Sequence, residues 1–144
     1  MDTVSSEKRS EIMRRVRQRN TGPEMVVRKL LHAIGYRFRL HRKGLPGSPD
    51  IVLPKYRAVI FVHGCFWHGH GCRKGRLPST RRDFWRAKID GNRSRDAKAE
   101  ADLNALGYRV LVVWECKVKD KETLEIRLKT FLPKKNQHGQ TFET

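Results

Sequence analysis

A chain of 144 residues that carries 32 Lys and Arg against 15 Asp and Glu has a formal net charge of +17. Its length suits one domain, and its 38% of hydrophobic residues can form a core, which excludes a disordered chain. A charge this large indicates a polyanionic partner, most often nucleic acid. A membrane surface is the weaker alternative, because the basic residues are spread along the whole chain.

Several other classes of protein are excluded by what the sequence lacks. No stretch is apolar over the ~18 residues that a membrane span needs, and the N-terminus has no hydrophobic region of the signal-peptide kind. Three cysteines are an odd number for a disulfide framework. We therefore expect an intracellular protein with no membrane partner, whose thiols are reduced or bind a metal.

The first third of the chain predicts two helices and a strand. Ser6 to Gln18 is typical of a short basic helix, and Thr21 is a candidate N-cap for a helix that stops at Gly35. Glu24 falls at the capping-box position of that second helix. The alternating apolar residues from Tyr36 to His41 suit a half-buried strand.

The remainder predicts three strands and three helices. A turn-rich loop leads to Asp50, which begins a short strand, Ile51–Leu53, and the uninterrupted apolar run Ala58–Val62 is typical of a central strand. The elements expected after it are a short helix capped by Ser79 or Thr80, a helix from Arg93 to Leu106, a strand from Tyr108 to Trp114, and a helix from Asp120 or Thr123 to Leu132. This order predicts an α/β fold, a mixed sheet covered by helices. We expect a basic N-terminal helix or arm over 1–20, one domain over 21–132 and a flexible tail over 133–144.

The most informative segment is the ten residues from His63 to Cys72, which hold two cysteines and three histidines of the chain in a glycine-rich loop. Buried structural cysteines are the alternative, but this loop is too polar to pack as core. Zinc prefers four sulfur or nitrogen ligands. The expected zinc ligands are Cys65, His70, Cys72 and Cys116. Since they leave no position open for water, we predict a structural zinc ion.

Two histidines of this segment, His63 and His68, are left for chemistry. If the strand that begins at Asp50 pairs with the one that ends at His63, the Asp50 carboxylate lies near the backbone carbonyl of Val62. Oxygen ligands of this kind suit Mg²⁺, and a neutral imidazole nearby can move a proton. An aspartate that only begins a strand, and histidines with structural roles, are the alternatives.

Three segments closely resemble the very-short-patch repair endonucleases: Gly47 to Asp50, Val59 to His68, and Val113 to Cys116. The resemblance covers about Ser10 to Leu132. It implies a restriction-endonuclease-like central mixed β-sheet flanked by helices, with a structural zinc site. It also implies a Mg²⁺-dependent enzyme that nicks one DNA strand on the 5′ side of the thymine in a T·G mismatch. Such mismatches arise when 5-methylcytosine deaminates, so the resemblance implies work in the bacterial cytoplasm, at the nucleoid, beside a DNA cytosine methyltransferase.

The resemblance also implies roles for individual residues. Asp50 and the Val62 carbonyl would hold Mg²⁺, His68 would be the general base, and His63 would support the network of water and phosphate. Glu24 would be a further acidic catalytic residue, with helix capping as the alternative. The sequence departs from the family where Val62 replaces a usual Thr, and where Gly69 and Gly71 replace histidines found in some relatives.

Aromatic residues of the same loop are candidates for reading the mismatch. Phe66 and Trp67 could wedge between base pairs, which costs least at a mismatch, although core packing is an alternative. The resemblance adds Trp85, Met13, Lys88 and Asn92 as DNA-binding residues, and an N-terminal helix that embraces the duplex. Met13 as helix core is the competing interpretation.

Two other functions remain open at this point. A zinc module that only binds DNA explains the charge and the cysteines, but it gives Asp50, His63 and His68 no role. A restriction-type or other nicking endonuclease of the same fold, without mismatch preference, explains all of them. Since a single-strand nick needs one active site, we expect a monomer.

Overall fold

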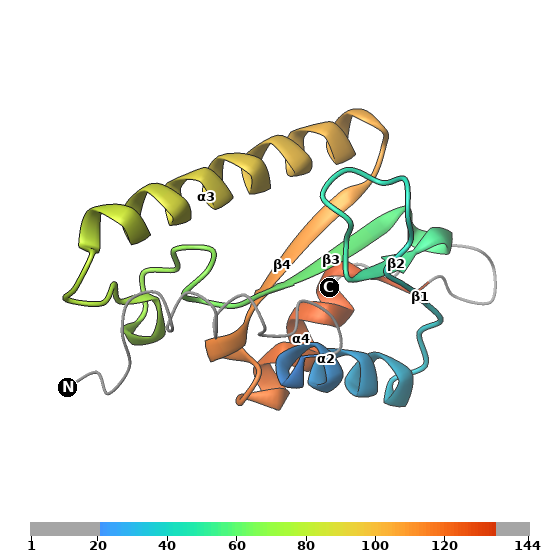
Figure 1. Cartoon of the computed structure of the whole chain (residues 1–144). Helices are drawn as coiled ribbons and strands as arrows, with labels where there is room; N and C mark the ends of the chain where they lie inside the picture. The colour runs from blue at the N-terminus through green and yellow to red at the C-terminus, as the bar shows by residue number, and fades with distance from the viewer. Residues whose placement is uncertain (1–20, 135–144) are drawn as a thin grey trace.

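The structure is a computed structural model, and it describes residues 21–134. The expectations for the segment 1–20, Met13 among them, and for 135–144 lie outside these residues. Within them a four-stranded sheet has the order β1-β2-β3-β4, and helices lie on both of its faces (Figure 1). The strands are β1 (Arg39–Leu40), β2 (Ile51–Leu53), β3 (Ala58–His63) and β4 (Arg109–Trp114), and the helices are α2 (Gly22–Ala33), α3 (Arg82–Ala105) and α4 (Lys121–Phe131).

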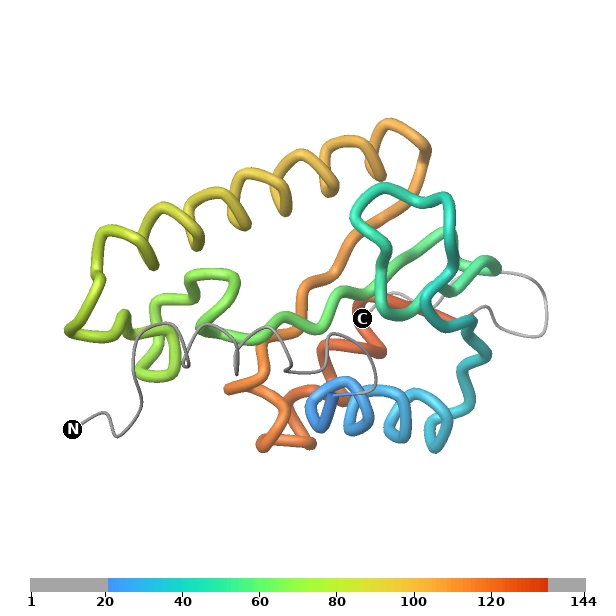
Figure 2. The backbone as a smooth tube through the Cα atoms, viewed as in Figure 1, coloured from blue at the N-terminus to red at the C-terminus, as the bar shows by residue number. Residues whose placement is uncertain are grey.

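The sheet is mixed, as the sequence predicts. β1, β2 and β3 pair antiparallel, whereas β3 and β4 pair parallel, in a register that sets Ala58 opposite Arg109 and His63 opposite Trp114. A parallel pair needs a crossover connection, and α3 provides it. The carboxyl ends of β3 and β4 therefore meet at one edge of the sheet, and the loop that follows β3 begins there (Figure 2).

Side chains of the strands are buried in two separate hydrophobic cores, one on each face of the sheet. Ile51, Ile60 and Val113 face α2 and α4, where they pack with side chains such as Leu31 and Leu128. The core on the opposite face is smaller, and its buried residues are Val52, Val59, Phe61 and Leu103. Because β3 is covered on both faces, its side chains are almost continuously apolar, as expected of a central strand.

The region after the His/Cys loop differs from the expectation of two helices. α3 is one helix of 24 residues, which continues through Gly91. A glycine inside a helix costs only about 1 kcal/mol relative to alanine, and the packing of the flanking turns offsets that cost. Neither Ser79 nor Thr80 caps the helix; the N-cap is Arg81, with a positive φ of 52° and no side-chain cap.

Two helix starts are confirmed and one strand is shorter than predicted. Thr21 Oγ1 accepts a hydrogen bond from the Glu24 amide at 3.3 Å, and Asp120 Oδ1 accepts one from the Thr123 amide at 3.1 Å. The strand expected over Tyr36–His41 is reduced to β1, because the Tyr36 side chain enters the core and its hydroxyl donates to the Leu132 carbonyl at 2.5 Å.

Candidate active site and metal centre

The predicted zinc ligands come together at the carboxyl ends of β3 and β4. Cys65, His70 and Cys72 lie on the loop after β3, and Cys116 lies just after β4. Their ligand atoms all lie within 4.8 Å of one another. His70 also stacks on Trp114, with 4.3 Å between the ring centroids. The loop is thus joined to the end of the neighbouring strand through these four side chains.

The separation of these atoms fits a tetrahedral zinc ion. Zn–S and Zn–N bonds of about 2.3 and 2.0 Å at a tetrahedral angle place sulfur and nitrogen about 3.5 Å apart. The distance from Cys116 Sγ to His70 Nδ1 is 3.5 Å. The Cys65 amide donates to Glu115 Oε1 at 3.0 Å, which fixes the loop beside the cluster. Three thiols and an imidazole at this spacing could hold zinc.

The titration of the thiols supports a cation at this position. Burial raises the pKa of Cys65 to about 12, whereas a hydrogen bond from His70 lowers the pKa of Cys72 to about 6. A completely buried thiol such as Cys65 becomes a thiolate readily only beside a positive charge. A metal ion would provide that charge.

Asp50 lies immediately before β2 and reaches the end of β3. Its Oδ2 accepts a hydrogen bond from the Val62 amide at 2.7 Å, so the expected neighbourhood of Asp50 and Val62 is present. Burial raises the pKa of Asp50 to about 7, and the nearby Glu24 carboxylate adds to the effect. Such a carboxylate is costly to ionise alone and gains from a bound cation.

His63, the last residue of β3, forms a stack with His68. Their rings are parallel, with 3.7 Å between the centroids and 3° between the planes. Burial, followed by the nearness of His68, lowers the pKa of His63 to about 4, so His63 is neutral near pH 7. His68 Nδ1 lies 2.5 Å from Asp96 Oδ2 on α3.

Asp96 is a site residue that the sequence interpretation missed. It stands in the middle of a charged helix, 28 residues from its histidine, and no local pattern distinguishes it from its neighbours. One signal was present: Trp85, Asn92 and Asp96 are spaced by seven and four residues, which places them on one face of a helix.

The backbone amide of Glu24 takes part in the N-cap of α2, whereas its side chain lies beside Asp50 and His41. The carboxylate is 1% exposed, and its Oε2 lies 3.0 Å from His41 Nε2 and 3.4 Å from Arg28 Nη1. Ligand atoms of Glu24, His41 and Asp50 lie within 4.8 Å of one another. His41 is a second residue that the sequence interpretation missed.

The aromatic side chains gather between the loop and the start of α3. The ring centroids of Phe66 and Trp67 lie 5.5 and 6.1 Å from that of Trp85. Asn92 Nδ2 donates to the Trp67 carbonyl at 2.9 Å, and Lys88 Nζ lies 5.6 Å from the centre of the Trp67 ring. Phe66 and Trp67 are half-buried, whereas Trp85 is 2% exposed and lies beneath them.

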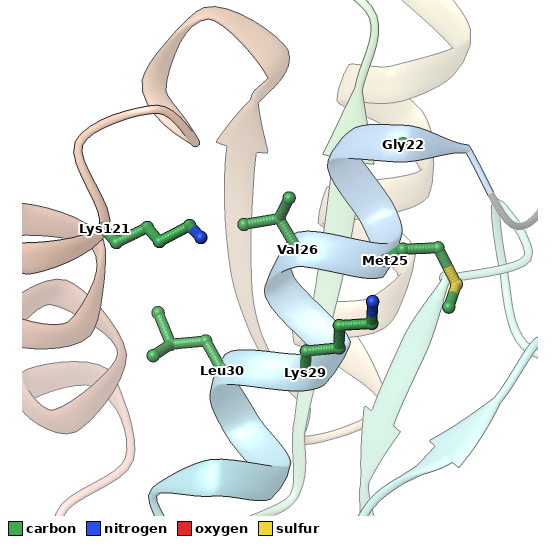
Figure 3. Close-up of a pocket in the computed structure, with 6 residues that line it drawn as sticks. All are labelled: Gly22, Met25, Val26, Lys29, Leu30 and Lys121. Atoms are coloured by element: carbon green, nitrogen blue, oxygen red, sulfur yellow. The ribbon is translucent and has the colours of Figure 1, made fainter.

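The described part of the chain has a groove of about 410 Å³ elsewhere, between α2 and the start of α4 (Figure 3). Lys121 of α4 reaches across it toward Val26 of α2. None of its six lining residues carries a carboxylate, an imidazole or a thiol. The groove is therefore lined by none of the acidic, histidine or cysteine residues of the candidate site. No helix in residues 21–134 is long and apolar enough to cross a membrane.

Comparison with solved structures defines the class of the fold. The catalytic domain of the homing endonuclease I-Bth0305I aligns with a TM-score of 0.56, over 78% of this chain and 94% of that domain, at 20% sequence identity. The mixed sheet with flanking helices is therefore restriction-endonuclease-like, as the sequence predicts.

Comparison with protein sequences defines the family. Residues 1–74 match the family model of the DNA mismatch endonuclease Vsr. The type II nicking enzyme V.XorIIP of Xanthomonas oryzae pv. oryzae is 60% identical over 131 residues, which cover 91% of this chain and 96% of that protein. The DNA mismatch endonuclease Vsr of Escherichia coli is 46% identical over 116 residues, which cover 81% of this chain and 74% of that protein. The chain belongs to the Vsr family and is a DNA endonuclease.

Proposed function

We propose that this enzyme nicks one strand of a DNA duplex on the 5′ side of the thymine in a T·G mismatch, by Mg²⁺-dependent hydrolysis. The observation that carries the proposal is the presence of two groups at the end of β3. The Asp50 carboxylate accepts a hydrogen bond from the Val62 amide, and the next residue, His63, stacks on His68. The proposal is also supported by membership of a mismatch endonuclease family, by relatives named as nicking enzymes, and by a net charge of +17 that suits a phosphate backbone.

Asp50 and the backbone carbonyl of Val62 are the proposed Mg²⁺ ligands. Their oxygen donors are of the type that Mg²⁺ prefers, and the raised pKa of Asp50 means that a cation there relieves an unfavourable charge. When bound, the cation supplies positive charge that polarises the scissile phosphate and makes a water molecule easier to deprotonate. Glu24 adds a second carboxylate within reach of the same position.

His68 is the proposed general base. A carboxylate only accepts hydrogen bonds when ionised, so Asp96 holds the His68 proton on Nδ1 and leaves Nε2 with a free lone pair. Nε2 can then take a proton from the attacking water. His63, held neutral beneath His68, supports the ring without adding a second positive charge.

Phe66 and Trp67 are the proposed mismatch wedge, with Trp85, Lys88 and Asn92 as further DNA-binding residues. Partial exposure leaves the two loop rings available to the duplex, while Lys88 and Asn92 contact Trp67 from α3. Contact of the buried Trp85 with a base requires the aromatic cluster to open. The proposed role of Met13 belongs to the segment outside the described residues.

Cys65, His70, Cys72 and Cys116 are the proposed ligands of a structural zinc ion. Their ligand atoms lie within 4.8 Å of one another, which supports one four-coordinate ion with no open position for a substrate. In this proposal the zinc holds the loop that carries His68 and the wedge against the end of β4.

A nicking assay on matched T·A and mismatched T·G duplexes tests the function. The zinc-loaded protein is compared with and without added Mg²⁺, because a strong chelator would also remove zinc. We expect nicks only with Mg²⁺, only in one strand, and mainly in the T·G duplex. Equal cleavage of both duplexes would instead support a nicking enzyme without mismatch preference. Absence of cleavage would support a DNA-binding module.

A further inference from the structure

We propose that His41 is a positioning residue of the catalytic site, which holds Glu24 with its ring and Asp50 with its backbone. The inference rests on the proposed function, in which these two carboxylates serve one cation. His41 stands immediately after β1, between α2, which carries Glu24, and Asp50, which immediately precedes β2. Three separate observations support the role.

The first observation is the contact of the ring. Nε2 of His41 lies 3.0 Å from Oε2 of Glu24, and the Glu24 side chain is 1% exposed. A carboxylate buried to this extent is unfavourable unless it accepts hydrogen bonds. His41 and Arg28 both contact the same oxygen, so two side chains restrain the orientation of the carboxylate.

The second observation is the contact of the backbone. The His41 amide donates to the Asp50 carbonyl at 3.1 Å, one step beyond the pair formed by Leu40 and Ile51. One residue therefore bonds to both acidic residues, which are far apart in the sequence. Ligand atoms of all three lie within 4.8 Å of one another.

The third observation is the conformation of the backbone. His41 has a φ of +46°, in the left-handed region that favours glycine. A residue with a side chain is held there only when the surrounding structure compensates, and such positions cluster at functional sites. The bond from the ring to Glu24 is the compensation that glycine could not provide.

These contacts assign a defined effect to His41. The His41 ring holds the Glu24 carboxylate beside Asp50 before the cation binds. The two carboxylates therefore lose less conformational entropy when the cation binds. Loss of the ring should weaken the binding of the divalent cation. It should not weaken the binding of DNA in the absence of the cation, and the fold should be kept because Arg28 still contacts the Glu24 carboxylate.

His41→Gly is the decisive variant, because it removes the ring and at the same time relieves the positive φ. Partners that orient metal ligands typically change metal affinity by about 10–100-fold, so we expect the Mg²⁺ concentration for half-maximal nicking to rise at least ~10-fold. The thermal midpoint should change little, because relief of the positive φ offsets the loss of one hydrogen bond to the buried carboxylate. His41→Gln keeps an N–H donor of similar reach and should recover most of the Mg²⁺ response. Ser48→Gly, at an exposed position with a φ of +48°, is the control for relief of a positive φ and should leave the Mg²⁺ response unchanged.

Binding of Mn²⁺ to the zinc-loaded protein, followed by the loss of the free-ion paramagnetic resonance signal, gives a second measurement that needs no turnover. We expect a Kd at least ~10-fold higher in His41→Gly than in the wild type. An unchanged Mn²⁺ Kd and an unchanged Mg²⁺ response would overturn the role of His41, as would a loss of activity that follows a fall in the thermal midpoint. A wild-type protein that binds Mn²⁺ but leaves T·G duplexes intact would overturn the proposed function instead, and the Mn²⁺ comparison would still decide the role of His41.

Discussion

His68 Nδ1 and Asp96 Oδ2 lie 2.5 Å apart, although the two residues come from a loop and from the middle of a helix. This pair sets which ring nitrogen carries the proton, and therefore which one can act as a base. The carboxylate favours a proton on Nδ1. The basicity of the opposite nitrogen, Nε2, thus depends on a side chain that does not itself touch the substrate.

Asp96→Asn should abolish most nicking without unfolding the protein. The amide can donate to Nδ1, which moves the ring proton to Nε2 and removes the lone pair. General base catalysis contributes about 10²–10⁴-fold, so we expect the single-turnover rate to fall by that order while binding of the duplex is kept. Asp102→Asn, which alters an exposed carboxylate of the same helix paired with Lys98, is the control and should nick normally. Equal rates for the two variants would contradict the role of Asp96.

Asp50→Asn should make the protein more stable and inactive. The pKa of Asp50 is raised to about 7 in the folded state from 3.8, chiefly by burial. The folded state therefore binds more protons than the unfolded state between these pH values, so the stability that Asp50 contributes is present below about pH 4 and is lost as pH rises through 7. Each pKa unit corresponds to about 1.4 kcal/mol, and partial exposure reduces the total to about 1–3 kcal/mol at pH 8.

Urea unfolding of the wild type and of Asp50→Asn without divalent cations, at pH 5 and pH 8, measures this difference. The advantage of the variant should be greater at pH 8. The same advantage at both pH values would mean that the Asp50 carboxyl does not titrate in this interval.

Cys116→Ser should release the loop from the end of β4. A serine oxygen is a poor substitute for a thiolate, so we expect the zinc content, about one ion per chain in the wild type, to fall well below one, with a lower thermal midpoint. Metal analysis after dialysis measures the first effect and calorimetry the second. Lys117→Ala, at the exposed neighbouring position, should change neither. Wild-type zinc content and stability in Cys116→Ser would exclude the zinc site.

Gly69→Ala and Gly71→Ala should differ, although they are two residues apart in the same loop. Gly69 has a φ of +65°, and a Cβ there would lie 2.7 Å from Ile89 Cγ2 and 2.8 Å from Arg93 Cδ. A Cβ at Gly71 would meet nothing within 4 Å. We expect Gly69→Ala to cost about 1–3 kcal/mol and Gly71→Ala less than about 0.5 kcal/mol in thermal or urea unfolding. A larger cost at Gly71 would contradict the described path of the loop.

Trp67→Ala should reduce the preference for a mismatch more than it reduces cleavage as such. Opening a base step costs a few kcal/mol and least at a mismatch, so loss of the wedge should lower the ratio of T·G to T·A cleavage by about 10-fold or more. Phe84→Ala removes an exposed ring of the adjacent helix that is not part of the proposed wedge, and should keep the ratio. An unchanged ratio in Trp67→Ala would remove Trp67 from mismatch recognition.

The sequence was sufficient where local signals coincide with the fold. The apolar runs of β3 and β4, the caps at Thr21 and Asp120, and the dense group of cysteines and histidines all predicted what the structure contains. These features depend on neighbours in the chain or on the ligand preferences of one metal.

What the sequence did not reveal depends on contacts between distant segments. His41 and Asp96 have no local pattern that marks them, because their importance comes from Glu24 and His68 on other elements. The continuity of α3 through Gly91 was missed because packing offsets a modest propensity cost. The family resemblance placed Glu24 in the site, while its capping position explained only its backbone.

The unbroken course of α3 has a consequence for how sensing and hydrolysis are related. Trp85, Asn92 and Asp96 all lie on the single helix α3, and Leu103 near its C-terminal end packs in the smaller core. In the proposed function, the residues that contact the wedge and the partner of the general base are therefore held on one element, so their relative positions are set by the helix itself.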